Sequence, residues 1–415
     1  MIKHLIIGGG VGGVLTAVYL QKKLGVPSRN LRILDPHPTL LARWYANIQA
    51  CGMKYLRSSS SHVLDTDFRS LRRFAAHSKR FDETDFTPPY RRPSVRLFQA
   101  HTESIMQQNT SAELHIGGSA QSMSRSSKGT LIVETDAGML EAENLILSPG
   151  AGDQPFRPAW ADSAPEIQHI YDPGFSVELE CTTRRGTRTP HVVIVGGGIG
   201  AAQHACLLVR GYGAKVTIIA RHEPTMSVFD FNPCYVGPSC LPAFLSTNDY
   251  GRRRTILKQE RYPGTLPPDV YAEIQALRKS GSISWVRGEV SRVEQNHRRE
   301  DQGCSAQNAL QTTAYITPSQ ADRKAQPEMQ VVCDELRLAT GFTTNWTGNQ
   351  FMRHITLEHN APCEVSGVPI PDTTLEWVSK VFLVGRAAEL EVGPPAGNII
   401  GMHNAAKRIC GKIAR

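Results

Sequence analysis

The sequence predicts an α/β fold built from two similar units, because one order of local signals occurs twice within 415 residues. Each unit begins with a short apolar run, passes through a glycine-rich turn and continues into a segment with helical periodicity. The two copies are HLIIGGGVGGVLTAVYL at residues 4–20 and HVVIVGGGIGAAQHACLL at residues 191–208. Strand, glycine turn and helix in this order are typical of a Rossmann-like dinucleotide-binding domain. We therefore expect two such domains.

The first glycine turn fits the pattern G-x-G-x-x-G. Gly8 permits the tight turn, Gly10 allows the backbone to approach a pyrophosphate, and Gly13 allows the helix to pack closely. The N-terminus of the following helix, which we predict from Val14 to Lys23, faces the phosphates in such domains. The residues expected to bind a nucleotide here are Gly8, Gly10, Val11, Gly12 and Gly13.

An acidic residue ends the next predicted strand, in the segment LRILDPHP. Asp35, which is followed by Pro36, stands where such domains bind the ribose of adenosine. Its carboxylate would accept hydrogen bonds from the ribose hydroxyls and would repel a 2′-phosphate. We therefore expect this first site, with Asp35 and Pro36 at its edge, to take FAD or NAD.

The second turn fits G-x-G-x-x-A, and the strand after its helix ends at Arg221, in the place that Asp35 has in the first unit. A guanidinium there holds a 2′-phosphate through charge-assisted hydrogen bonds, so we expect NADPH. The alternative is an exposed arginine that binds no ligand, and the run Arg252-Arg253-Arg254 offers further candidates for the phosphate. The residues expected to bind this nucleotide are Gly196, Gly198, Ile199, Gly200, Ala201 and Arg221.

Two unequal nucleotide sites in one chain indicate hydride transfer between a carrier that stays bound and a reductant that comes and goes. A flavin is the carrier that fits the first site, and NADPH is the reductant that fits the second. The two cofactors we expect are therefore FAD and NADPH.

The first domain is expected at residues 1–187, with a helical and loop-like insertion at about residues 36–100. Beyond the insertion, the sequence predicts a hairpin that turns at residues 136–138. A separate short strand, Leu145 to Leu147, is predicted next, and it ends at Gly150.

The second domain is expected at residues 188–345, with a polar excursion at about residues 295–330 and a final strand that runs towards Gly341. Residues 346–415 then supply another strand, Val381 to Val384, and a closing helix. These last elements return to the first domain, so the second domain is inserted in the first.

Composition favours an ordinary globular protein, since 40% of the residues are hydrophobic and 20% are charged. No stretch approaches the roughly 20 apolar residues that a membrane helix needs. The first strand begins at residue 4, which leaves no room for a secretory signal. A cytoplasmic location without a membrane partner is the expectation.

The formal net charge is +8, but the basic residues occur as short pairs and triplets and form no continuous stripe. No aromatic residues interleave with them, so nucleic acid is not an expected partner. A positive surface of this kind attracts anionic phosphates, and an acidic carrier protein stays open as a partner. The oligomeric state also stays open.

The nine cysteines are scattered and never form C-x-x-C. This argues against a disulfide framework, a zinc ribbon and a redox dithiol, and no metal site is expected. The closest pair, Cys234 and Cys240, is expected to consist of packing or loop cysteines.

With these motifs in place, the chain resembles the flavoproteins that have two dinucleotide-binding domains. Within that class it is similar to the single-component, NADPH-dependent flavin monooxygenases related to lysine and ornithine N-hydroxylases. The paired glycine turns resemble the FAD and NADPH fingerprints of these enzymes. LATGF at residues 338–342, MKYLRS at residues 53–58 and GPPAGNIIG at residues 393–401 resemble three further family segments.

The resemblance places MKYLRS over the flavin and GPPAGNIIG at the start of the helix that faces the isoalloxazine ring. Further cofactor-binding residues are expected at Met53, Gly150, Gly341, Gly385, Gly397 and Ile399. The chain also departs from its relatives, because Gly385-Arg386 stands where related reductases often have Gly-Asp to hold the FAD ribityl chain. Only a fragment around His169 resembles the fingerprint F-x-G-x-x-x-H, and no residue that grips ornithine or lysine is recognisable.

The activity that the resemblance implies is oxygenation of a small nucleophilic substrate, for example N-hydroxylation of an amine. NADPH reduces FAD, and the reduced flavin forms a C4a-hydroperoxide with O2. The catalytic candidates are Asn398 at the start of the closing helix, and Lys54 and Arg57 in MKYLRS. Asn398 as a helix cap, and Lys54 and Arg57 as surface charges, are the structural alternatives.

Two other functions fit the same motifs. One is an FAD/NADPH oxidoreductase that passes electrons to a quinone or a protein without oxygenation. The other is a nucleotide-binding redox sensor without catalysis.

Overall fold

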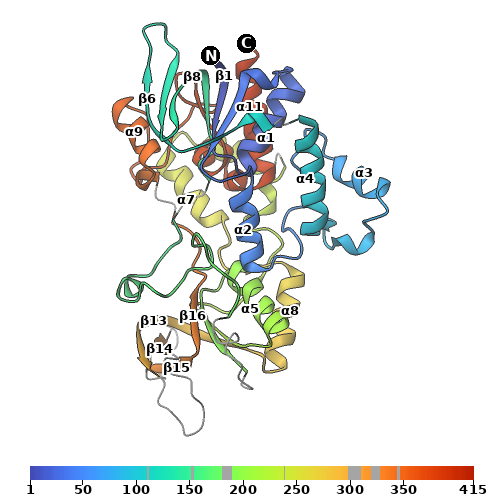
Figure 1. Cartoon of the computed structure of the whole chain (residues 1–415), viewed down its shortest axis with the longest axis vertical. Helices are drawn as coiled ribbons and strands as arrows, with labels where there is room; N and C mark the ends of the chain where they lie inside the picture. Colours follow the sequence, from blue (N-terminus) through green and yellow to red (C-terminus); the bar gives the residue numbers. More distant parts are fainter. Residues whose placement is uncertain are drawn as a thin grey trace.

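The computed structural model describes residues 1–109, 112–150, 154–179, 189–237, 239–297, 310–318, 328–343 and 346–415. These residues form two α/β units, one above the other in Figure 1, and both chain termini lie in the same unit. Within the described ranges, no helix has the length and apolar character needed to cross a membrane.

The first sheet has the strand order β17-β18-β8-β1-β2-β5, and the β6-β7 hairpin pairs with β8. Its strands are β1 (Ile2–Ile7), β2 (Leu31–Asp35), β5 (His115–Gly117), β6 (Ala120–Arg125), β7 (Leu131–Thr135), β8 (Gly138–Leu147), β17 (Glu376–Val378) and β18 (Val381–Leu383). The central strands run parallel and are buried, as their continuous apolar sequences predict. Helix α1 (Val11–Leu24) packs against α11 (Ile399–Ile413), where the Tyr19 hydroxyl shares a 2.9 Å hydrogen bond with Nδ1 of His403.

Strand β8 joins two elements that the sequence predicted as separate. Its first half pairs antiparallel with β7 around the turn at residues 136–137, and its second half pairs parallel with β1. The predicted strand from Leu145 to Leu147 is therefore the end of a longer strand. One strand serves both the hairpin and the parallel sheet, and no turn separates them.

The second sheet has the order β15-β14-β13-β10-β9-β16. Its strands are β9 (His191–Val195), β10 (Lys215–Ala220), β13 (Ile283–His297), β14 (Leu310–Pro318), β15 (Met329–Cys333) and β16 (Glu335–Leu338). The chain leaves the first sheet after β8 and returns to it at β17, so the second unit is inserted in the first, as predicted. Much of the predicted polar excursion, at residues 298–309 and 319–327, lies outside the described residues.

The segment after β2 contains α2 (Ala42–Cys51), α3 (Ser70–His77) and the start of α4 (Val95–Asn109), with the short strands β3 (Phe86–Thr87) and β4 (Arg92–Pro93) between α3 and α4. Helix α2 lies against α5 (Ile199–Tyr212) of the second unit, where His204 Nδ1 donates to the Ala50 oxygen at 2.7 Å. Helices α3 and α4 form a lobe at the side of α1 (Figure 1). The insertion thus includes a contact between the two units.

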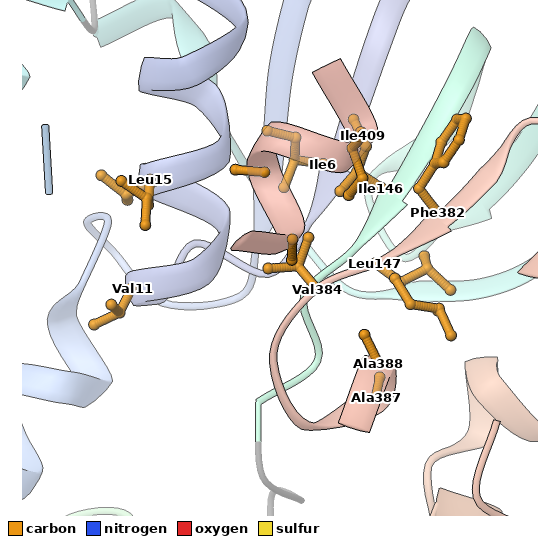
Figure 2. Close-up of a cluster of buried hydrophobic side chains, with 14 of the residues drawn as sticks. Ile6, Val11, Leu15, Ile146, Leu147, Phe382, Val384, Ala387, Ala388 and Ile409 are labelled. Carbon is orange, nitrogen blue, oxygen red and sulfur yellow. The ribbon is translucent and has the colours of Figure 1, made fainter. Parts of the chain in front are cut away.

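Part of the second unit packs into the core of the first. Phe229, Phe231, Phe244 and Leu257 belong to the buried cluster that surrounds the first sheet. These residues come from the chain around α6 (Leu241–Leu245) and α7 (Tyr250–Glu260). Figure 2 shows another region of this cluster, where Leu147 and Val384 lie near each other and the Val384 amide donates to the Leu147 oxygen at 2.9 Å.

The expectation for Cys234 and Cys240 was wrong, because the structure joins them in a disulfide. Their Cα atoms are 5.4 Å apart, within the range that a disulfide spans. The 3₁₀ turn at Pro233–Tyr235 brings the chain back on itself, and the Cys240 amide donates to the Cys234 oxygen at 3.4 Å. The Asn232-Pro233 pair is a local signal for this turn, but the spacing of the two cysteines did not indicate the bond.

Buried histidines are a source of pH-dependent stability. Six histidines have a lowered pKa, and burial is the largest cause in each. The pKa of His204 falls to about 3, and the pKa of each of the other five falls to about 4. At His204 the neutral form is also dictated by its partners, since Nε2 faces Arg337, which only donates. These histidines are His4, His62, His101, His169, His204 and His403.

We predict that the free energy of unfolding falls as the pH drops from about 6.5 to about 4. The folded state keeps these rings neutral while the unfolded chain protonates them, so the stabilisation is complete above pH 6.5. Each such ring contributes a slope of about 1.4 kcal/mol per pH unit in this window. Urea unfolding at pH 7.5 and pH 5 measures the effect, and His204→Gln should reduce it. Equal stability at both pH values would contradict the prediction.

Candidate active site

The first glycine turn lies between β1 and α1, where the main chain at the end of β8 passes close by. Gly8 has φ +103°, and a Cβ on it would lie 2.2 Å from the Ser148 oxygen. A Cβ on Gly13 would lie 1.9 Å from the Gly8 oxygen, whereas a Cβ on Gly10 would meet nothing within 4 Å. The fold therefore needs glycine at positions 8 and 13, while the space beside Gly10 is open to a ligand.

Helix α1 begins without a side-chain cap at its N-cap residue, Gly10. The first intrahelical bond runs from the Val14 amide to the Gly10 oxygen at 3.0 Å. The amides of Val11, Gly12 and Gly13 precede this bond, at the positive end of the helix dipole. Such a terminus is suited to bind the phosphates of a nucleotide.

The Asp35 carboxylate, at the end of β2, is fixed beside this turn. Its Oδ2 accepts from the Gly9 amide at 2.6 Å, and its Oδ1 accepts from the His37 amide at 2.9 Å. Pro36, the next residue, is exposed. An acid held in this position marks the edge of the first site with negative charge.

The second turn repeats this construction between β9 and α5. Gly196 has φ +137°, and a Cβ on it would lie 2.3 Å from the Ala339 oxygen. A Cβ on Gly200 would lie 2.3 Å from the Tyr171 hydroxyl, and Ala201 is fully buried. Gly198 is the N-cap of α5 with no side-chain cap, and its surroundings are open like those of Gly10. Ile199 is the first residue of the helix.

Arg221 is exposed directly after β10, so the contrast with Asp35 is present in the folded chain. Two of the other arginine candidates are already paired with α10 (Glu389–Val392). Arg254 contacts Glu389 at 2.5 Å, and Arg253 forms a buried ion pair with Glu391. These two guanidinium groups connect the units, so they are not suited to a 2′-phosphate.

The ends of β8 and β18 and the helix α11 meet at the first turn of α1. A Cβ on Gly12 would lie 2.6 Å from Ser148 Oγ, 3.1 Å from Val384 Cγ1 and 3.6 Å from Met402 Sδ. Gly385, with φ +75°, follows Val384 immediately. Figure 2 shows Val11 and Val384 on neighbouring elements of this junction.

The remaining predicted cofactor residues lie around this junction or near the second unit. Ile399 starts α11, and only Asn398 separates it from the 3₁₀ turn η8 (Pro394–Gly397). Gly150 and Gly341 both have positive φ, +79° and +84°. Met53 is half-buried and packs against the core of the second unit. None of these positions by itself identifies a ligand.

Arg57 connects the MKYLRS segment to the second unit. Its guanidinium donates to the main-chain oxygens of Val228 at 2.6 Å, Ser227 at 2.9 Å and Thr265 at 3.2 Å. Burial lowers its pKa, and nearby Asp230 opposes that effect. Arg57 is therefore a partly buried connector between the two units and not an exposed surface charge.

Asn398 occupies the N-cap position of α11, but its side chain makes no cap hydrogen bond. Its Nδ2 donates instead to Oδ1 of Asp230 at 3.2 Å. The Asn398 side chain therefore does not cap α11, contrary to the structural alternative. Asp230 also acts electrostatically on Arg57, so these two candidates share one acidic neighbour.

Lys54 lies apart from the other two catalytic candidates. Its Nζ is 3.4 Å from Oε1 of Glu273 on α8 (Pro268–Lys279), and its side chain is 55% exposed. Glu273 also pairs with Arg210 at 2.5 Å. This is the pattern of a partly exposed ion-pair group, which agrees with the structural alternative for Lys54.

Sequence reasoning missed Asp230 and the full environment of Arg386. The only local signal for Asp230 is its place between two aromatic residues, in the run Phe229-Asp230-Phe231.

His169 and His403 are fully buried, and His403 Nε2 donates to the Val63 oxygen at 2.8 Å. Among the described residues, no group of three or more His, Cys, Asp or Glu is arranged to hold a metal ion.

Two helices begin behind glycine turns without a side-chain cap. A carboxylate lies beside one of these turns, and a guanidinium lies at the equivalent strand end beside the other. This arrangement is that of an oxidoreductase with two dinucleotide-binding domains. The family model of pyridine nucleotide-disulphide oxidoreductases matches residues 2–232. The chain belongs to this family. A search of curated proteins gives no match.

Solved structures share the fold over the whole chain. Ornithine N-hydroxylase of Kutzneria sp. 744 matches with a TM-score of 0.73 and 14% identity, covering 100% of this chain and 99% of that one. The FAD-bound cadaverine monooxygenase of Erwinia amylovora has a TM-score of 0.70 and 12% identity, covering 100% and 95%. L-lysine 6-monooxygenase of Pseudomonas syringae has a TM-score of 0.69 and 16% identity, covering 100% and 99%.

We predict opposite effects for alanine at two glycines of the first turn. Gly13→Ala should lower the free energy of unfolding by about 1 to 3 kcal/mol, because its Cβ would overlap the Gly8 oxygen. Gly10→Ala should leave the stability of the nucleotide-free protein unchanged and weaken FAD binding by about tenfold or more. Denaturation and FAD titration of both variants test this pair. Full FAD affinity in Gly10→Ala would show that no ligand occupies the space beside residue 10.

Proposed function

We propose that this protein is an FAD-dependent, NADPH-using monooxygenase that oxygenates a small nucleophilic substrate. The observation that supports this most is the similarity, over nearly the full length of both chains, to enzymes that bear the names of amine hydroxylases. Because those enzymes are named for three different amines, the particular substrate of this chain does not follow from the similarity.

The residues present fit the two cofactors. The open space beside Gly10, the uncapped start of α1 and the fixed Asp35 carboxylate suit the pyrophosphate and ribose of FAD. The open space beside Gly198 and the exposed Arg221 suit the phosphates of NADPH. When bound, the flavin supplies the redox chemistry and activates O2.

The protein's own task is to bind, orient and exclude water. Arg57 fixes the main chain at residues 227–228 and 265 against the MKYLRS segment. Asn398 contacts the same region through Asp230. In this proposal the two side chains shape the substrate side of the flavin pocket, and Lys54 is a peripheral charge.

An acidic carrier protein stays a prediction from the positive charge of the chain, and the oligomeric state stays open. The reductase and the redox sensor are the outcomes that would replace oxygenation. Stopped-flow reduction and reoxidation of the FAD-loaded protein separate oxygenation from these two outcomes.

We predict that the FAD-loaded protein is reduced by NADPH and then reacts with O2 through a transient absorbing species, the hydroperoxide expected from the resemblance. Stopped-flow absorbance measures both steps. Ornithine, lysine and cadaverine serve as probe amines, with mass spectrometry and isotopically labelled O2 to detect a transferred oxygen atom. Reduction followed by direct reoxidation, with no oxygen transfer to any amine, would favour a reductase. A protein that takes up no FAD would contradict both enzymatic functions.

We also predict that Arg221 selects the phosphorylated coenzyme. Arg221→Ser should raise the KM for NADPH by about tenfold to hundredfold, the effect of about 1.5 to 3 kcal/mol lost with a charged hydrogen bond. The KM for NADH should stay unchanged, since NADH lacks the 2′-phosphate. Arg252→Ser, at an exposed arginine on α7, is the control. A loss of NADPH preference in the control but not in Arg221→Ser would move the phosphate site to α7.

A further inference from the structure

Arg386 is a basic residue at a position where the chain departs from its relatives. It follows Gly385 in the 3₁₀ turn η7 (Gly385–Ala388), directly after β18. Strand β18 is parallel to β8, so this turn lies at the same edge of the first sheet as the glycine turn before α1. The side chain therefore starts beside the first nucleotide site.

The side chain of Arg386 extends from η7 towards the start of α11. A Cβ on Gly397 would lie 3.0 Å from Arg386 Cγ and 3.1 Å from Arg386 Nε. Gly397 is the last residue before the N-cap of α11, Asn398. The absence of a side chain at residue 397 thus allows the guanidinium to lie against the positive end of a second helix.

Burial lowers the pKa of Arg386, and the nearby arginines Arg261 and Arg254 act in the same direction. An arginine nevertheless keeps its charge at neutral pH. A guanidinium that is half-buried in this way is destabilised unless an anion or hydrogen-bond acceptors compensate it.

The acids near Arg386 are engaged by other groups. Glu389 Oε1 contacts Arg254 at 2.5 Å, and Glu389 Oε2 contacts Arg261 at 2.6 Å. Asp230 Oδ1 accepts from Asn398 at 3.2 Å. Glu389 and Asp230 are close enough to affect Arg386 electrostatically, but across the ranges that the structure describes Arg386 makes no ion pair or hydrogen bond of its own.

The charge balance of this group favours an anionic ligand. Arg254, Arg261 and Arg386 face Glu389 and Asp230, and Arg57 adds a further positive charge beside Asp230. Arg57 donates to neutral main-chain oxygens, and among the described residues it forms no ion pair with Asp230. Positive charge is therefore in excess between η7 and the N-terminus of α11.

We propose that Arg386 compensates the negative charge that the flavin acquires on reduction. This inference rests on the proposed function, because it requires FAD in the first site. Hydride transfer from NADPH delivers two electrons and one proton to FAD, which leaves an anionic reduced flavin and NADP+. A guanidinium and a helix N-terminus at one end of the flavin stabilise that anion more than the neutral oxidised ring.

The test compares the affinities of the protein for oxidised and reduced FAD. Arg386→Met should weaken the binding of reduced FAD by about tenfold more than that of oxidised FAD, which lowers the two-electron reduction potential by about 30 mV. Arg386→Lys should retain most of the wild-type potential because the charge stays. Potentials are measured without substrate, by anaerobic titration against a reference dye.

Arg408→Met is the matched control. Arg408 is a half-buried arginine on α11 whose Nη1 donates to the Glu391 oxygen at 3.0 Å, away from Gly397. Its loss should leave the potential unchanged. The thermal stability of the FAD-free variants is measured in parallel, so that a purely structural role for Arg386 is recognised.

An unchanged potential in Arg386→Met, with FAD bound, overturns the proposal. A changed melting temperature at constant potential assigns Arg386 to packing, and a changed KM for substrate at constant potential assigns it to an anionic substrate. Both outcomes also overturn the proposal while leaving the FAD site intact. If Arg386→Met does not fold, the same comparison of affinities for reduced and oxidised FAD is made with Arg386→Gln and Arg386→Lys. If the wild-type protein binds no FAD, the proposed function itself is wrong. That outcome is distinguishable from an unchanged potential in Arg386→Met.

Discussion

The close approach of main chain to main chain at the two glycine turns is the constraint on which the rest of the structure depends. At Gly8 the carbonyl oxygen of Ser148, and at Gly196 that of Ala339, occupy the volume that a Cβ would need. Each contact brings the end of a neighbouring strand against the turn and directs the N-terminus of α1 or α5 to the carboxyl edge of its sheet. Because the same contact occurs twice, one chain presents two anion-binding helix ends.

Polar ties across the boundary between the units hold these two sites in one arrangement. Arg57 donates to main-chain oxygens of the inserted unit, and Arg92, which is fully buried, contacts Asp269 at 2.6 Å. Arginines of α7 also pair with Glu389 and Glu391 of α10. Breaking one partner of such a buried pair leaves an uncompensated charge, which is costly. The ties therefore favour one relative placement of the two nucleotide sites.

Charge distinguishes the two sites more than shape does. Asp35 is fixed by the amides of Gly9 and His37, whereas Arg221 is exposed at the equivalent strand end. A second positive region, around Arg386 and the start of α11, lies where the first site meets the inserted segment. A ligand that gains negative charge during its reaction is stabilised in such surroundings. The distribution of charge thus agrees with reduction of a cofactor in the first site by a phosphorylated coenzyme in the second.

The sequence by itself determined the glycine turns, the buried parallel strands, Asp35 and Arg221, because these depend on neighbours a few residues away along the chain. Helix ends at Gly25 and Gly213 were equally local. Only the tertiary structure decided that Asp230 meets Asn398, that Arg386 lies on Gly397, and that Cys234 bonds to Cys240. It also extended β8 through two predicted elements. These features depend on contacts between segments that the fold brings together, and periodicity carries no information about such contacts.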